Sequence, residues 1–199
     1  MLLLEGDLPP YRAPLGTVIV DLMTVIYAEA SAAIADGRRA NCDFSVRPIA
    51  PSDADALVRF HEQLSDQAIR LRYFNLHRNL APDEVAHLTT VDGCNRVAYV
   101  VEHKDEIVGV GRYDRCDKPC RAEVAFVVAD EFQHQGLGPM LLERLVETAK
   151  LVGIGEFCAS VLAENATMLA VFHCAGFPFT EEHVSDVVEL TMEIGPSCM

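Results

Sequence analysis

Two glycines, Gly136 and Gly138, stand one residue apart in the run Gln133-His134-Gln135-Gly136-Leu137-Gly138. The run lies between a predicted strand that ends at Ala129 and a predicted helix that begins near Gly136. Glycines let a backbone approach a ligand closely, and the N–H groups and positive dipole end of a helix N-terminus favour an anion. The turn therefore predicts a phosphate-bearing ligand. The same glycines would also serve a tight turn that binds nothing.

Two common phosphate-binding patterns do not fit this run. A dinucleotide-binding fingerprint would need a third glycine where Leu141 stands. A P-loop would need Gly-Lys followed by Ser or Thr, which the run lacks.

A third pattern does fit, because Gln133, Gly136 and Gly138 match Gln/Arg-x-x-Gly-x-Gly/Ala between a strand and an amphipathic helix. This run resembles the pyrophosphate-binding motif of the GNAT acyltransferases. Asn165, followed by Gly176-Phe177, resembles a second motif of the family, in which an Asn opens a helix that ends in Gly-Phe.

Two further strings are similar to bacterial Pat-type protein lysine acetyltransferases. They are Ile69-Arg70-Leu71-Arg72-Tyr73-Phe74 and Ala122-Glu123-Val124-Ala125-Phe126-Val127-Val128-Ala129-Asp130. Similar strings also occur in GNAT proteins with other acceptors.

The resemblance implies acetyl-CoA as cosubstrate. Backbone groups of Phe126 and Val128 would pair with the pantetheine arm where the fourth strand splays from the fifth, and the amides of 135–140 would hold the pyrophosphate. His134 has an alternative interpretation as an exposed turn histidine. The residues assigned to the cofactor are Phe126, Val127, Val128, Gln133, His134, Gln135, Gly136, Leu137, Gly138, Pro139, Met140, Asn165 and Phe172.

Glu123 is the predicted general base. A lysine amine is almost wholly protonated at pH 7, and only the neutral amine attacks a thioester. Glu123 is an acidic residue in a strand of Ala, Val and Phe, and it matches the glutamate base of Pat-type enzymes. The alternative is a solvent-facing glutamate paired with Arg121 or with a neighbouring strand.

Phe172 departs from the family pattern. Many GNAT enzymes have a tyrosine at this place in the helix that follows the Asn, where its hydroxyl protonates the leaving thiolate. A phenyl ring cannot donate a proton, and the neighbouring His173 and Cys174 point elsewhere on a helix. Because a thiol has a pKa near 8.5, we expect solvent to suffice as the acid.

The acceptor is predicted from the resemblance and from charge. The formal net charge of −14 argues against nucleic-acid binding and suits a cationic partner. A lysine side chain of a protein is the expected acceptor. Two alternatives stay open: a small amine or polyamine acceptor, and a module that binds acyl-CoA without catalysis.

The elements that must position these residues predict an α+β chain. Strands are expected at 44–49, 96–102, 106–113, 123–129, 157–162 and 187–194, and helices after Pro51, Ser65, Pro82, Gly136 and Asn165. Short loops imply an antiparallel meander with one βαβ crossover. This order fits the GNAT fold, with a mixed, mostly antiparallel sheet flanked by helices and a V-shaped splay between the fourth and fifth strands.

Two regions are expected: an N-terminal extension over 1–43 with one helix at Val18–Ala35, and the acyltransferase domain over 44–199. The extension would cover a sheet edge or form a homodimer contact. No membrane span and no signal peptide are predicted, so we expect a cytoplasmic protein.

The seven cysteines and the histidines predict no metal site. The nearest cysteine pair, Cys116 and Cys120, is expected to be an adventitious or redox-active pair in a hairpin loop. Arg70 and Arg72 are expected to solvate their helix.

Overall fold

The strands of the protein form one mixed sheet. The computed structural model describes residues 43–74 and 79–195, so the predicted helix Val18–Ala35 lies outside it. The described strands are β1 (Phe44–Pro48), β2 (Arg96–His103), β3 (Glu106–Arg115), β4 (Arg121–Val128), β5 (Glu156–Leu162), β6 (Phe179–Val184) and β7 (Val187–Glu193). Their spatial order is β1-β2-β3-β4-β5-β7-β6, and β4–β5 is the parallel pair among the described strands.

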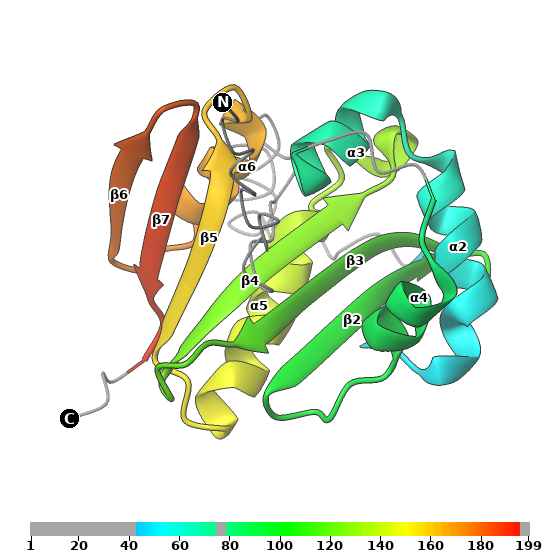
Figure 1. Ribbon diagram of the computed structural model, residues 1–199, viewed down its shortest axis with the longest axis horizontal. Coiled ribbons are helices and arrows are strands. Elements are labelled where there is room, and N and C mark those ends of the chain that lie inside the picture. The colour runs from blue at the N-terminus through cyan, green and yellow to red at the C-terminus, as the bar shows by residue number, and fades with distance from the viewer. Residues whose placement is uncertain (1–42, 75–78, 196–199) are drawn as a thin grey trace, which may run out of the picture.

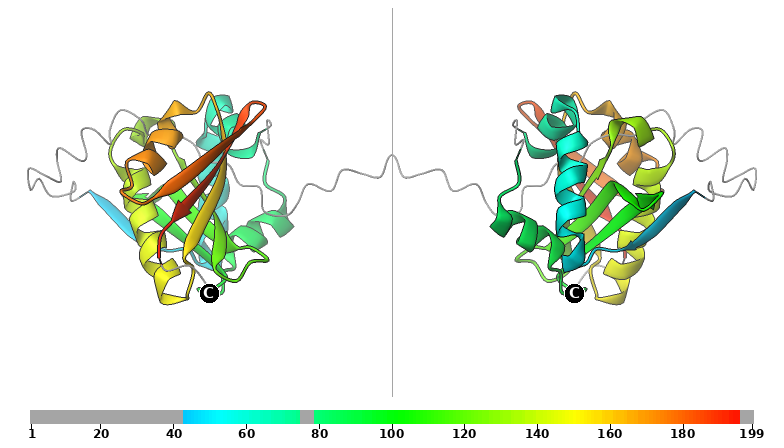
Figure 2. Two further views of the ribbon diagram at one scale, coloured as in Figure 1. Left: turned by 90° about the vertical axis from the view of Figure 1, so that its left-hand side faces the viewer. Right: turned by 90° about the vertical axis from the view of Figure 1, so that its right-hand side faces the viewer.

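Helices cover both faces of this sheet (Figure 1). The helices are η1 (Pro51–Asp53), α2 (Ala54–Gln63), α3 (Asp66–Tyr73), α4 (Pro82–Thr89), η2 (Asp130–Phe132), α5 (Leu137–Leu151) and α6 (Ala166–His173). The side views in Figure 2 show α2, α3 and α4 on one face and α5 and α6 on the other. The predicted α+β architecture, its meander and its β4–α5–β5 crossover are confirmed.

Local chemistry explains several boundaries. Ser65 caps α3 by accepting the Ala68 N–H at 3.1 Å, as its place before an amphipathic run predicts. The helix expected after Pro51 begins with the 3₁₀ turn η1 and continues as α2. Strand β6 was not predicted, because every residue of Phe-Thr-Glu-Glu-His-Val is exposed and the segment has no apolar alternation.

Each face of the sheet has its own hydrophobic core. The larger core lies under α5 and α6 and contains Phe126, Leu141, Leu145 and Phe172, each with at most 1% of its surface exposed. A second core under α2 and α3 contains Phe60, with Val110 and Val127 from the sheet. The central strands are therefore buried on both faces, which fits the nearly continuous apolar sequence of β4.

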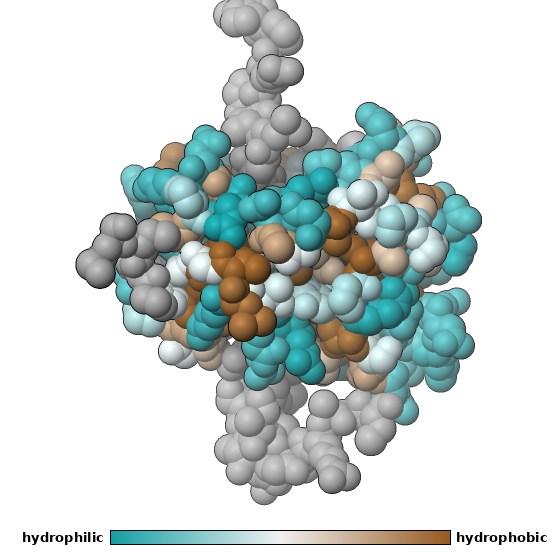
Figure 3. All heavy atoms as spheres, turned by 90° about the horizontal axis from the view of Figure 1, so that it is seen from below, coloured by the Kyte–Doolittle hydropathy of each residue, from teal (hydrophilic) through white to brown (hydrophobic). Residues whose placement is uncertain are grey.

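The surface of the described residues is mixed. Viewed from below, hydrophobic side chains form small patches among hydrophilic ones (Figure 3). None of the helices in the described part of the chain combines the length and apolarity needed to cross a membrane.

Close packing at Gly111 fixes α5 against the sheet. A Cβ at Gly111 would stand 2.8 Å from Phe126 Cδ1 and 3.0 Å from Leu141 Cβ. We expect Gly111→Ala to lower the free energy of unfolding by about 1–3 kcal/mol, because the core there has no room for a methyl group. Chemical denaturation measures this change.

Gly109→Ala on the same strand is the matched control. Its Cβ would meet nothing closer than 3.4 Å, an ordinary contact. Equal losses in the two variants would contradict the packing argument.

Candidate active site

Strands β4 and β5 pair over a short stretch and then separate. Their parallel ladder contains three described residue pairs and ends at Glu123–Cys158, while β4 continues to Val128 and β5 to Leu162. Figure 1 shows the two strands diverging from their paired ends. The predicted V-shaped splay is confirmed.

Glu123 lies in the last pair of this ladder, at the apex of the V. On its other side it pairs with Asp114 of β3, so two carboxylates stand directly opposite each other. Glu123 is partly buried. The predicted base is thus placed at the point where the space between the strands begins.

Beyond Glu123, the backbone of β4 is paired to β3 through Phe126–Gly111 and Val128–Gly109. On the β5 side the ladder has ended by then. An extended chain that adds to this edge would be held as an extra strand. Phe126, Val127 and Val128 are themselves buried, with at most 6% of each residue exposed.

The turn after β4 has the geometry of an anion cradle. Gly136 is the N-cap of α5 with a φ of 81°, and His134 also has a positive φ, 64°. The N-cap residue makes no side-chain hydrogen bond, and the first turn of α5 holds no acidic residue that would repel an anion. An anion such as a pyrophosphate fits this end.

The side chains around the turn have different roles. Gln133 Nε2 donates to the Val128 carbonyl at 3.3 Å, which holds the turn against the end of β4. Gln135 and His134 are exposed, Met140 is half-buried, and Leu137 is fully buried in the core. Pro139 lies in the first turn of α5, where it is tolerated because the amides there have no intrahelical acceptor.

Asn165 and Phe172 lie on the other arm of the V. Asn165 is 2% exposed, and its Oδ1 caps α6 by accepting the Met168 N–H at 3.1 Å. Phe172 is fully buried, with its ring 6.4 Å from that of Phe126. Both residues therefore support the V from within the protein.

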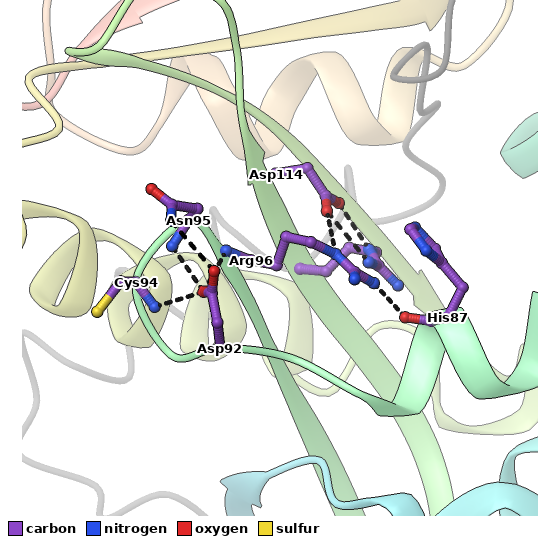
Figure 4. Close-up of polar contacts among 7 residues, drawn as sticks. His87, Asp92, Cys94, Asn95, Arg96 and Asp114 are labelled. Atoms are coloured by element: carbon purple, nitrogen blue, oxygen red, sulfur yellow. Dashed lines mark hydrogen bonds and ion pairs between the residues drawn. The ribbon is translucent and has the colours of Figure 1, made fainter.

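A charged network that sequence reasoning missed lies beside Glu123. Asp114 accepts from Arg112 Nε at 3.0 Å and from Arg96 Nε at 3.2 Å. The Arg96 guanidinium also donates to the His87 carbonyl at the end of α4 (Figure 4). Burial, then the charges of Arg96 and Arg112, lower the pKa of His87 from 6.5, so this imidazole is neutral at pH 7.

The loop before β2 anchors this network. The Asp92 carboxylate accepts the backbone N–H groups of Cys94, Asn95 and Arg96 at 2.7–2.8 Å. These bonds, led by that from Arg96, lower the pKa of Asp92 to about 2. The loop is therefore held by an ionised carboxylate, and it presents Arg96 to Asp114 (Figure 4).

The expectation for Arg70 and Arg72 is right for the first and wrong for the second. Arg70 is half-exposed and pairs with Glu164 at 2.7 Å. Arg72 is 7% exposed and turns into the protein, where burial lowers its pKa while Glu123 and Asp114 raise it. In the sequence the two arginines differ only in helical phase, since Arg72 lies one turn from Ile69 and Ala68.

The cysteines are arranged differently from the expectation. Cys116 Sγ lies 3.9 Å from Cys158 Sγ, across β4, and this contact replaces the expected pairing with Cys120. Burial, with the neighbouring Cys158, raises the pKa of Cys116 to about 12, so its thiol is protonated at neutral pH. Within residues 43–74 and 79–195, no group of His, Cys, Asp and Glu is arranged to hold a metal ion.

Known proteins share this fold. The chain is 35% identical to the GNAT domain of S. lividans PAT, with a TM-score of 0.70, over 74% of this chain and 89% of that one. It is 26% identical to acetyltransferase Pat of Mycolicibacterium smegmatis over 77% of this chain, but spans only 46% of that longer protein.

A more distant structure is the spermidine N-acetyltransferase of Vibrio cholerae, solved with CoA and spermine. It is 16% identical to this chain, with a TM-score of 0.60. The match covers 77% of this chain and 97% of that one. At this identity the likeness concerns the fold. The model of the acetyltransferase (GNAT) family matches residues 59–177, a range that includes Glu123 at the apex of the V, strand β4 and the turn before α5. The chain therefore belongs to the GNAT acetyltransferase family.

Proposed function

We propose that the protein transfers the acetyl group of acetyl-CoA to a primary amine, with the Nε of a protein lysine as the acceptor class. The observation that carries this proposal is the end of the β4–β5 ladder at Glu123. A carboxylate thus lies at the apex of the V, on the strand whose far end leads to the N-terminus of α5. The base and the anion cradle thus lie along one rigid strand.

In the proposed reaction, Glu123 accepts a proton from the acceptor, directly or through water. Deprotonating a lysine ammonium at pH 7 costs about 4–5 kcal/mol. The neutral amine attacks the thioester carbon, the new N–C bond forms, and the C–S bond breaks. The amine loses its second proton to solvent, and the thiolate of CoA leaves.

The cosubstrate would be held by residues of β4 and of the turn. The edge of β4 from Phe126 to Val128 would pair with the pantetheine arm. The backbone amides between Gln135 and Met140 would hold the pyrophosphate, and Gln133 would keep the turn on the strand. Asn165 and Phe172 would support the opposite arm of the V.

No general acid is assigned to the leaving thiolate. Phe172 cannot donate, and His173 is occupied on the surface, where it pairs with Glu181 and stacks on Phe179 at 4.9 Å between ring centroids. A thiol with a pKa near 8.5 is a good enough leaving group for water to protonate it.

The choice of a protein lysine rests on likeness to the two Pat proteins and on the acidic composition of the chain. A small amine or polyamine is the second candidate acceptor, favoured by the fold likeness to the spermidine enzyme. The protein is further proposed to act in the cytoplasm, with its N-terminal segment as a homodimer contact.

A binding module without catalysis is the alternative function. It is motivated by the absence of a tyrosine at Phe172. Incubating the protein with acetyl-CoA and a panel of lysine peptides and amines, and measuring free thiol, separates the two functions. A module that only senses acyl-CoA would bind it and release no thiol.

Removal of the base should slow the reaction without weakening cosubstrate binding. We expect Glu123→Gln to lower kcat at pH 7 by about 10²–10⁴-fold, the usual range for general-base catalysis. The affinity for acetyl-CoA should stay within about twofold, since an amide of the same size fills the place. Steady-state kinetics and calorimetry measure the two quantities.

Glu156→Gln provides the matched control. Glu156 is a strand carboxylate on β5 that pairs with Arg121 at 3.1 Å, and it is not part of the proposed site. The assignment of Glu123 as the base would be wrong if Glu123→Gln were as active as the wild type at all pH values. It would also be wrong if Glu156→Gln lost as much activity as Glu123→Gln.

The cradle makes a separate prediction about affinity. Alanine at Gly136 must adopt a left-handed φ near 81°, which costs about 1–2 kcal/mol. Relief of this strain would shift the turn, so we expect Gly136→Ala to weaken CoA binding about tenfold. Calorimetry with CoA measures the affinity.

Gly153→Ala is the matched control. Gly153 lies at the far end of α5 with a φ of 76°, and nothing lies within 4 Å of the new Cβ, so the variant carries the same strain. It should lose stability but keep its affinity; equal affinities in both variants would rule out the cradle.

A further inference from the structure

A small cavity lies under α2, α3 and α4, on the same face of the sheet as Glu123. Its volume is about 30 Å³, which is room for about two water-sized groups. Its walls are mostly apolar, from residues such as Leu57, Phe60 and Val127, and its polar lining includes Arg72 and Arg112. The cavity is too small for a whole acceptor residue, and it fits the polar end of a chain.

Arg72 supplies this cavity with a buried cation. The residue is 7% exposed, and its guanidinium lies over the Tyr73 ring, 4.9 Å from the centroid. Within the described residues, the guanidinium makes no hydrogen bond or ion pair. A buried charge without a hydrogen-bonded counter-ion is unfavourable, and an anionic ligand would offset that cost.

The described carboxylates around this cation are shared with other arginines. Asp114 is already shared between Arg96 and Arg112, and Glu123 is the other carboxylate that acts on Arg72. Among the described residues, Arg72, Arg96 and Arg112 thus share the carboxylates of Asp114 and Glu123. This cluster of arginines contrasts with the formal net charge of −14 of the whole chain.

The register of β3 and β4 relates the cavity to Glu123. Side chains of one strand alternate between faces, so Glu123, Ala125 and Val127 share a face. Opposite them stand Asp114, Arg112 and Val110. The row that contains Arg112 is about 7 Å along the strand from the row of the base, by two residues of β rise. An anionic group a few bonds from the reacting centre spans that distance.

We infer that Arg72 and Arg112 bind a carboxylate of the substrate, and that the protein prefers a substrate carrying one a few bonds from the reacting atoms. This inference rests on the proposed acyl transfer. A carboxylate can enter from two sources: the far end of a dicarboxylic acyl group on CoA, or the α-carboxylate of an amino-acid acceptor. Planar guanidinium groups bind both in the same way.

A binding experiment tests the site independently of catalysis. Succinate is titrated against the wild type, Arg72→Met and Arg72→Lys, and the melting temperature is followed. We expect succinate to stabilise the wild type, to stabilise Arg72→Lys less, and to leave Arg72→Met unshifted. Arg72→Met itself should fold, because it replaces an unpaired buried charge with an apolar chain of similar length.

Kinetic measurements then separate the two sources. One arm compares succinyl-CoA with acetyl-CoA on the same lysine peptide. The other compares free lysine with lysinamide, both with acetyl-CoA. In one of the two arms, we expect the wild type to have a kcat/KM about tenfold higher for the substrate that carries the carboxylate. Arg72→Met should lose that preference.

Arg70→Met is the matched control, since Arg70 lies two residues away on the same helix but is exposed. It should keep the preference. The inference is overturned if succinate stabilises Arg72→Met as much as the wild type, if neither arm shows a preference, or if Arg72→Met lowers both members of an arm equally. Should the wild type transfer no acyl group at all, the proposed function fails, and the succinate titration alone decides whether the anion site exists.

Discussion

The short parallel ladder between β4 and β5 is the constraint on which the site depends. Three described pairs hold the strands together up to Glu123, and beyond that residue the described ladder ends. Phe126 from β4 and Phe172 from α6 lie in the core under α5 and α6, with their ring centroids 6.4 Å apart. Gly111 allows Phe126 and Leu141 to pack against β3, so these contacts also fix the start of α5.

Much of the fold was predictable because its signals are local. The caps at Ser65 and Asn165, the glycine turn before α5 and the apolar periodicity of α5 each depend on neighbours within one or two turns. Glu123 was chosen as the base from likeness to a family, and the register places it in the last pair before the splay. Strand β6 had no such signal, since its residues are exposed and pair with β7 at the edge of the described sheet.

The charged surroundings of the site could not be predicted in this way. Arg72 and Arg70 look alike in the sequence, but α3 buries one and exposes the other because its apolar face turns towards the sheet. Arg96, Arg112 and Asp114 come from two strands whose register sets their contacts. The Cys116–Cys158 contact likewise joins segments that are adjacent only in the folded chain. Interactions of this kind depend on topology, which local patterns do not encode.

The sign of the charge beside Glu123 limits how an acceptor approaches. An ammonium group that entered through the cavity would meet Arg72 and Arg112 before it met the base, and like charges in a poorly solvated site repel strongly. In the proposed reaction, the amine of a lysine would therefore reach Glu123 by another route, through the open side of the V. A carboxylate has the opposite preference and is drawn towards the arginines. The proposed base and the proposed anion site would thus orient a substrate that carries both charges, with its carboxylate towards Arg72 and its amine towards Glu123.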